Sequence, residues 1–306
     1  MNTKDISAVN CYLMALAPSG RRSMKSQLNQ VAQLLGEKSI DDVEWHKLEY
    51  QQLIFIRSKL QEADKSVNTI NTTLAAIRGV VRTAFKMELV SAEHMARICQ
   101  LGSVRGTAKK GGMSLSLEES RRIVKRASET KGLKGLRDSA LLMLMITTGL
   151  RRSEVVALNH ENFDFDRYRV SVYGKGGKLR YHDVSGVTLK RLKQWASECS
   201  DAAGSSPFFT VVLKQGASDK RLTVNSIYRI VKGYGETIGI TGLRPHDLRR
   251  TYISLLLEQG SDLSLVSKAA GHANVMTTTR YDKRHVNAQT EAMRTLTDNL
   301  GRGLGL

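Results

Sequence analysis

A glycine- and lysine-rich stretch, residues 102–113, divides this 306-residue chain into two parts of different character. The stretch holds four glycines and three basic residues, and it lacks the apolar periodicity of a helix or a strand. Ser116 and Glu119 then form a capping-box pattern, which predicts that a new helix begins there. Because a chain of this length can bury two cores, we predict one domain over residues 1–102, a linker over 103–113 and a second domain over 114–306.

The first part shows helical periodicity throughout. Apolar residues recur three or four positions apart in four segments, which predicts helices over residues 22–35, 43–60, 67–89 and 95–101. Gly36 and Gly102 follow the first and the last of these segments, where glycine commonly ends a helix. The pattern indicates a compact bundle of four or five helices.

The second part mixes helices with a few strands. An almost wholly apolar segment, 136–146, predicts a buried helix. Strands are predicted over 162–166, 169–173 and 179–184, with a glycine-rich hairpin turn between the last two. Further helices are expected over 187–198, 224–238, 246–258, 263–270, a short segment up to Tyr281, and 286–300. The fold class expected for the whole chain is therefore mainly α with a small β-sheet, α+β.

The charge indicates a polyanionic partner. The 47 basic and 29 acidic residues give a net charge of +18, and residues 107–306 hold 33 and 19 of them, a net of +14. Nucleic acid is the leading candidate. An anionic membrane surface is the rival, but no run of 18 apolar residues exists and the N-terminus lacks the plan of a signal peptide. We therefore expect a cytoplasmic protein with access to DNA.

The three cysteines argue against a structural metal site. Cys11, Cys99 and Cys199 lie far apart in the sequence, and no CxxC or Cys/His cluster is present. We interpret all three as reduced thiols, and no metal site is predicted.

Two arginines and a histidine form a candidate phosphate site. Arg151 follows the apolar helix and Gly149, so a turn can direct its side chain out of the core. His246 and Arg249 are three residues apart at the start of a helix, just after Pro245, and share one face. Arginine offers planar paired donors to phosphate oxygens, and histidine can move a proton near neutrality. Taken singly, each residue also fits an ordinary role near a helix end.

Three more residues complete a possible phosphoryl-transfer set. Lys175 lies in the glycine-rich turn of the hairpin, His272 follows Gly271, and Tyr281 comes nine residues later. A lysine at a hairpin tip can protonate a leaving oxygen, and a tyrosine hydroxyl can form a covalent intermediate. A solvated lysine, a structural histidine and a packing tyrosine are the ordinary alternatives when each is taken alone.

In their order and spacing these residues resemble the tyrosine recombinase (phage integrase) family over nearly the whole chain. The matching stretches are Thr148-Gly-Leu-Arg-Arg-Ser-Glu154, Tyr173-Gly-Lys-Gly-Gly-Lys178, Pro245-His-Asp-Leu-Arg-Arg-Thr251, Gly271-His-Ala-Asn274 and Thr277-Thr-Thr-Arg-Tyr281. The family often has a second histidine where this chain has Arg250, at a position that is not catalytic.

The resemblance implies a role for each site residue. Arg151 and Arg249 would bind the scissile phosphate, Lys175 would act as general acid, and His246 as acid or base. His272 would donate a hydrogen bond to the phosphate, Tyr281 would be the nucleophile, and Glu154 would support the site. Further contacts to DNA are expected from the basic residues around them: Arg152, Lys178, Arg180, Arg244, Arg250 and Arg280.

The resemblance also implies an architecture and partners. The first domain would be a helical core-binding (SAM-like) domain, and the second a catalytic domain ending in an oligomerisation helix. The expected partner is double-stranded DNA with specific core sites, bound by a tetramer on two sites, with a possible accessory recombination factor and no cofactor. The family implies a bacterial or phage-encoded enzyme acting on the nucleoid, in integration, excision or resolution of mobile DNA. A type IB topoisomerase and a non-catalytic DNA-binding protein remain the alternatives.

Overall fold

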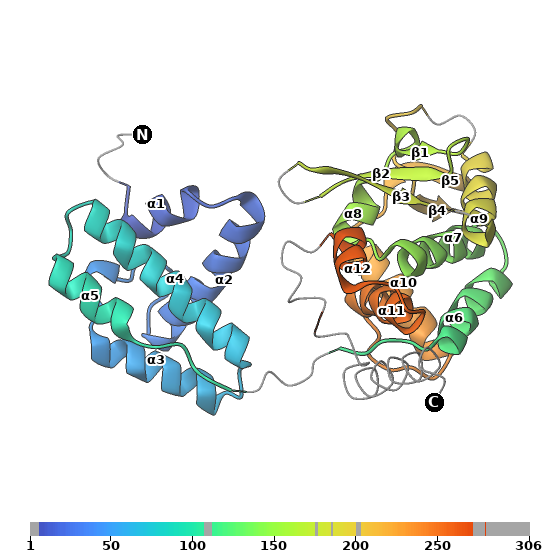
Figure 1. Cartoon of the computed structure of the whole chain (residues 1–306). Helices are drawn as coiled ribbons and strands as arrows, with labels where there is room; N and C mark the ends of the chain where they lie inside the picture. Colours follow the sequence, from blue (N-terminus) through green and yellow to red (C-terminus); the bar gives the residue numbers. More distant parts are fainter. Residues whose placement is uncertain are drawn as a thin grey trace, which may run out of the picture. The chain divides into compact units, whose positions relative to one another are not determined.

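A computed structural model describes residues 6–106, 112–174, 177–184, 186–199, 203–271 and 279 of the chain. It divides into two compact units, Met1–Gly111 and Gly112–Leu306 (Figure 1). The division falls within the residues expected to form the linker. Each unit has its own hydrophobic core.

The first unit is built from helices alone in its described part. These are α1 (Ala8–Met14), α2 (Pro18–Leu34), the short 3-10 helix η2 (Trp45–Lys47), α3 (Tyr50–Glu62), α4 (Val67–Lys86) and α5 (Ala92–Gln100). The prediction of one helix over 43–60 was wrong at its start, because η2 precedes α3. Helix α3 begins after Glu49, whose backbone N–H donates a hydrogen bond to the side chain of Gln52 in the first turn of the helix. Helix α1 was not predicted.

Helix α4 organises the first core. It packs against α1, α2, α3, α5 and η2. Its buried residues include Ile70, Leu74, Ile77 and Val81, which recur at helical spacing along one face. Ser66 caps the helix, because its hydroxyl accepts from the backbone N–H of Thr69 at 3.1 Å.

The second unit surrounds a buried helix. Its helices in the described residues are α6 (Leu117–Glu129), α7 (Leu133–Thr148), α8 (Arg152–Ala157), η3 (His160–Asn162), α9 (Gly186–Ser197), α10 (Val224–Thr237), α11 (Pro245–Glu258) and α12 (Leu263–Ala270). Helix α7 contains the segment predicted to be buried, and it packs against α6, α9 and α11. The predicted capping box of α6 is confirmed, with Ser116 and Glu119 each accepting from the other's backbone N–H.

The described part of the second unit also holds two small antiparallel sheets. The three predicted strands form one sheet in the order β1 (Phe163–Asp164), β2 (Arg169–Tyr173) and β3 (Leu179–Asp183). In β2 and β3, Tyr173 pairs with Leu179 and Arg169 with Asp183, as expected for a hairpin. A second sheet, β4 (Thr210–Leu213) with β5 (Gly216–Arg221), was not predicted. The fold is mainly α with small sheets.

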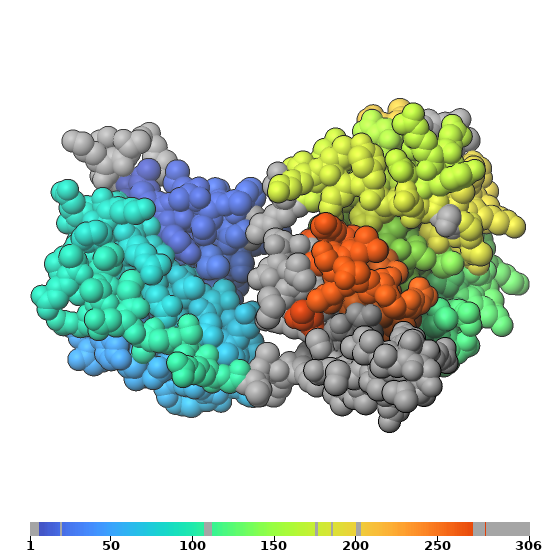
Figure 2. Space-filling view, in the orientation of Figure 1, coloured from blue at the N-terminus to red at the C-terminus, as the bar shows by residue number. Residues whose placement is uncertain are grey.

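The fold brings four chain segments together in the second unit. These are the turn from α7 to α8, the hairpin of β2 and β3, the start of α11 and the end of α12. In the space-filling view, the surface of α11 and α12, in orange, borders on that of the hairpin, in yellow-green (Figure 2). This junction holds the residues described below.

None of the helices in the described ranges is both long and apolar enough to cross a membrane. Cys11, Cys99 and Cys199 form no disulfide bond in the structure.

Candidate active site

Arg151 owes its position to the end of α7. The helix stops at Gly149, which adopts a left-handed conformation with φ 64° and donates from its N–H to the carbonyl of Met145. Leu150 then returns to the core, 1% exposed, and Arg151 becomes the N-cap of α8 in an extended conformation. Its side chain is 39% exposed. The turn therefore presents Arg151 at the surface beside a buried helix, as the sequence predicted.

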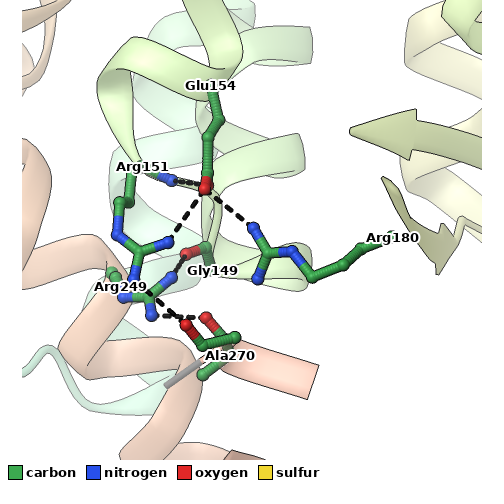
Figure 3. A network of polar contacts seen from close by, with 7 residues as sticks. Gly149, Arg151, Glu154, Arg180, Arg249 and Ala270 are labelled. Carbon is green, nitrogen blue, oxygen red and sulfur yellow. Dashed lines mark hydrogen bonds and ion pairs between the residues drawn. The ribbon is translucent and has the colours of Figure 1, made fainter. Parts of the chain in front are cut away.

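Arg249 lies deeper, on the first turns of α11. Pro245 occupies the first turn of this helix, and Arg249 is only 2% exposed. Its guanidinium donates to the carbonyl of Gly149 at 2.8 Å and also to the carbonyl of Ala270 (Figure 3). Since both carbonyls lie at helix C-termini, the arginine neutralises the partial negative charge of two helix ends.

Glu154 joins the arginines into one network. Its carboxylate is 7% exposed, and its Oε2 accepts from the backbone N–H of Arg151 at 2.8 Å. Its Oε1 accepts from Arg151 at 2.8 Å and from Arg180 on β3 at 2.7 Å (Figure 3). Arg151 also donates to the carbonyl of Gly271 at 3.2 Å. One buried carboxylate thus orients two guanidinium groups.

A cavity of about 400 Å³ opens beside this network. Four arginines, a histidine and a tyrosine line it, together with Ser153 and Pro245: Arg151, Arg152, Arg244, Arg249, His246 and Tyr228. The positive charges and the size suit an anionic group such as a phosphodiester. The sequence predicted Arg151, His246 and Arg249 as one site, and the structure brings these three to a single cavity.

Among the described residues, two histidines close to the network, His246 and His182, are biased toward the neutral form. Partial burial, reinforced by the charges of Arg250 and Arg249, lowers the pKa of His246. Burial within β3 lowers the pKa of His182 to about 4, with the charge of Arg180 acting in the same direction. A neutral His246 can both accept and donate a hydrogen bond at physiological pH.

The other basic residues expected to contact DNA occupy different environments. Arg152 and Arg244 are exposed at the cavity, and Lys178 is exposed beside the hairpin turn. Arg250 is half-buried against Gly112, where a Cβ would overlap its guanidinium. Arg180 is 20% exposed and points into the Glu154 network. Contact with DNA stays a prediction for all five.

Four predicted site residues lie outside the described residues: Lys175, His272, Arg280 and Tyr281. Gly174 and Gly271, which precede Lys175 and His272 in the sequence, are described, and both lie next to the guanidinium of Arg180.

Sequence reasoning missed two features of the site. Tyr228 lines the cavity from α10, and no motif in the sequence marks it. The sequence also did not predict that backbone carbonyls would accept hydrogen bonds from Arg249, although Gly149 was recognised as a helix end. Both depend on how distant segments pack, which local patterns do not encode.

Comparison with known proteins agrees with these observations. The family model described as the phage integrase family matches residues 114–289, more than half of the chain. Tyrosine recombinase XerA of Pyrococcus horikoshii is 29% identical over 248 residues, 80% of each protein. Tyrosine recombinase XerC of Pseudomonas entomophila is 30% identical over 258 residues, again 80% of each.

A solved structure shares the fold. The Tn1549 transposon integrase, in complex with a circular intermediate DNA, aligns with a TM-score of 0.70 and 15% sequence identity. The alignment covers 95% of this chain and 100% of that chain. On the family match and the relatives together, the chain belongs to the phage integrase family of tyrosine recombinases, enzymes that break and rejoin DNA.

Proposed function

We propose that this protein recombines DNA at specific sites through a covalent tyrosine intermediate. The observation that carries the proposal is the cavity in which Arg151 and Arg249, fixed by buried contacts, lie beside His246. Two guanidinium groups held in place offer donors to the non-bridging oxygens of a phosphodiester. Such preorganised charge stabilises the negative charge that develops when the phosphorus is attacked.

In the first step, the hydroxyl oxygen of Tyr281 attacks the scissile phosphorus. His246 accepts the hydroxyl proton, which its lowered pKa permits, because the imidazole is neutral and free to take it. The bond to the 5′ oxygen breaks, Lys175 protonates that oxygen, and His272 donates a hydrogen bond to the phosphate. The products are a 3′-phosphotyrosyl bond and a free 5′ hydroxyl.

In the second step, a 5′ hydroxyl of another strand attacks the phosphotyrosyl bond. The phosphodiester re-forms, and the tyrosine recovers its proton. The ester bond stores the energy of the broken phosphodiester, so the exchange needs no ATP. Exchange between two sites makes the reaction recombination, whereas rejoining of the same strand would make it relaxation.

The rest of the chain has roles in binding and assembly under this proposal. Residues 1–102 form a core-binding domain that, with the exposed Arg152, Lys178 and Arg244, contacts double-stranded DNA. The helix expected over 286–300 joins protomers into a tetramer on two sites. The enzyme acts in the cytoplasm on mobile DNA. The net charge of +14 over residues 107–306 supports a DNA partner.

Covalent capture tests the proposal. The protein is mixed with a labelled library of nicked duplexes from the DNA that flanks its gene, without metal or ATP, and run on a denaturing gel. We expect a shifted band that Tyr281→Phe abolishes without loss of DNA binding, whereas Tyr168→Phe, at an exposed turn, leaves it intact. Sequencing the trapped DNA gives the core site.

Two outcomes would contradict the proposal. An adduct that persists in Tyr281→Phe would mean that another group is the nucleophile. Binding without any adduct would favour a non-catalytic DNA-binding protein. Once the core site is known, a plasmid carrying two copies separates recombination, which changes its connectivity, from relaxation, which changes only its supercoiling.

A further inference from the structure

Arg180 is held inside the second unit although it lies on a short surface hairpin. On β3 it pairs with Val172, and its side chain is 20% exposed. One terminal nitrogen, Nη2, donates to Oε1 of Glu154 at 2.7 Å (Figure 3). Its Nε and Nη1 are buried and have no hydrogen-bond partner among the described residues. Burying an arginine in this way costs free energy, so a compensating role is expected.

Two glycines enclose the guanidinium group of Arg180. A Cβ on Gly271 would overlap Nη1 and lie 2.5 Å from Cζ. A Cβ on Gly174 would lie 3.3 Å from Nε and 3.5 Å from Nη2. The guanidinium therefore fills the space between the end of α12 and the hairpin turn, and it has little room to reorient.

The contact of Arg180 with Glu154 bears on Arg151. The two arginines share the same carboxylate oxygen, at 2.7 and 2.8 Å. Arg180 binds the Glu154 carboxylate from β3, and Arg151 binds it from the start of α8. The carboxylate is therefore held from two directions and does not move whenever the side chain of Arg151 moves. Arg151, Arg180 and the neighbouring Arg249, which binds two backbone carbonyls, carry three positive charges against the single negative charge of Glu154, a net charge of +2. A phosphodiester carries about two negative charges in its pentacoordinate state, so the network complements that state.

We propose that Arg180 is a positioning residue for DNA cleavage: it holds the Glu154 carboxylate, and through it Arg151, without contacting DNA. This inference rests on the proposed function and departs from the expectation that Arg180 binds the DNA backbone. Arg180 also joins the segments that continue into Lys175 and His272, since its two glycine neighbours directly precede them.

The test compares cleavage rate with DNA affinity in Arg180→Met, Arg180→Lys and Arg169→Met. Arg169 is a matched control, because it forms an ion pair with Asp183 at 3.0 Å on the same hairpin but is exposed. The probe is the nicked duplex captured by the wild-type protein, and adduct formation is timed at saturating protein. Affinity for the same duplex is measured over a range of salt concentrations, and melting temperatures are recorded for all variants.

We expect Arg180→Met to slow cleavage about 10- to 100-fold, because a small displacement of Arg151 costs rate at the reacting phosphate. Its DNA affinity and the salt dependence of that affinity should match the wild type, and Arg180→Lys should recover part of the rate. Arg169→Met should cleave at the wild-type rate. If the substitutions only damaged the structure, the cleavage rates of Arg180→Lys and Arg180→Met would fall in proportion to the decrease in their melting temperatures, and that result would contradict the inference.

A double-mutant cycle with Glu154→Gln tests whether Arg180 acts through the carboxylate. If it does, Arg180→Met adds little to the loss caused by Glu154→Gln. The inference would be overturned if the double variant lost cleavage rate by the product of the two single losses. It would also be overturned if Arg180→Met bound DNA more weakly with a salt slope reduced by about one, which is the sign of a lost phosphate contact. A wild type that forms no adduct would instead overturn the proposed function, so the two failures are distinguishable.

Discussion

A 2.8 Å hydrogen bond joins the guanidinium of Arg249 to the carbonyl of Gly149, a residue one hundred positions earlier in the chain. Arg249 also donates to the carbonyl of Ala270, so a single side chain connects the start of α11 to the ends of α7 and α12. The residue proposed to bind the phosphate is thus also a structural link between three helices. Substitutions at this position should affect stability and cleavage together.

Arg249→Lys tests this double role. A lysine cannot span both carbonyls with a planar fork, so one buried acceptor loses its partner, and we expect the free energy of unfolding to fall by about 1–3 kcal/mol. Loss of paired donors to the phosphate should slow cleavage about 100-fold or more. The control is Arg137→Lys, another buried arginine that donates to a carbonyl, that of Thr210, away from the site. It should lose stability but retain cleavage, and equal loss of cleavage in both variants would contradict the assignment.

Alanine substitutions at two glycines can distinguish the effect of backbone strain from the effect of crowding the side chains of the site. Gly260 and Gly271 follow α11 and α12 with φ of 87° and 64°, a region that disfavours other residues. A Cβ meets nothing within 4 Å at Gly260 but overlaps Arg180 at Gly271. We expect Gly260→Ala to cost about 1 kcal/mol and to leave cleavage unchanged. Gly271→Ala should destabilise more and slow cleavage, measured by urea unfolding and adduct formation. Identical behaviour of the two variants would show that strain alone decides.

The helices and the arginines of the site could be predicted from local sequence because their signals are local. Helix α12 spans Leu263–Ala270, the bounds predicted from the sequence, and Gly271 forms its C-cap. Arg151 was recognised from the helix end at Gly149, and Arg249 from its spacing with His246. In each case, a cap or a helical period within a few residues carries the information.

What could not be predicted depends on contacts between distant segments. Strand β5 reads Gly-Ala-Ser-Asp-Lys-Arg, which has little β propensity and forms only because β4 pairs with it. In β3 the usual alternation is reversed, since Leu179 and Tyr181 are exposed while Arg180 and His182 face inward. The inward direction of Arg180 follows from the buried carboxylate of Glu154, which lies 26 residues earlier and has no signature in the strand itself.

His182 should make the second unit sensitive to acid. Its folded-state pKa is about 4, below the ordinary value of 6.5, chiefly because of burial. The unfolded chain therefore takes up a proton that the folded chain refuses, and stability is lost as the pH falls from about 6.5 to about 4. The loss at pH 5 should be about 2 kcal/mol relative to pH 7.5.

Tryptophan fluorescence can measure this effect in the second unit alone. The chain has two tryptophans, Trp45 in the first unit and Trp195 in the second, so Trp45→Phe leaves Trp195 as the reporter. In that background, His182→Leu should remove most of the difference in urea unfolding between pH 7.5 and pH 5. If the difference survives, another group, such as His160 with its lowered pKa, dominates.

Asp247, on α11, binds the segment around Met113 at the start of the second unit. Its carboxylate is buried; one oxygen accepts from the N–H of Met113 at 3.1 Å and the other from the N–H of Arg244 at 3.0 Å. Asn has a single acceptor oxygen, so Asp247→Asn should leave one of these donors without its partner, at a cost of about 1–3 kcal/mol.

Hydrogen exchange can localise the effect of Asp247→Asn. The backbone N–H of Arg244 belongs to the cap of α11, which keeps it beside residue 247. We therefore expect the amide of Met113, rather than that of Arg244, to lose its partner and to exchange about tenfold faster. The amide of Leu115 is an internal control, because it donates to the hydroxyl of Thr251 at 2.9 Å and is untouched by the substitution. Faster exchange at both amides would mean that the start of α11 has opened. Faster exchange at Met113 alone would show that the carboxylate, rather than the helix, holds the entering chain beside His246 and Arg249.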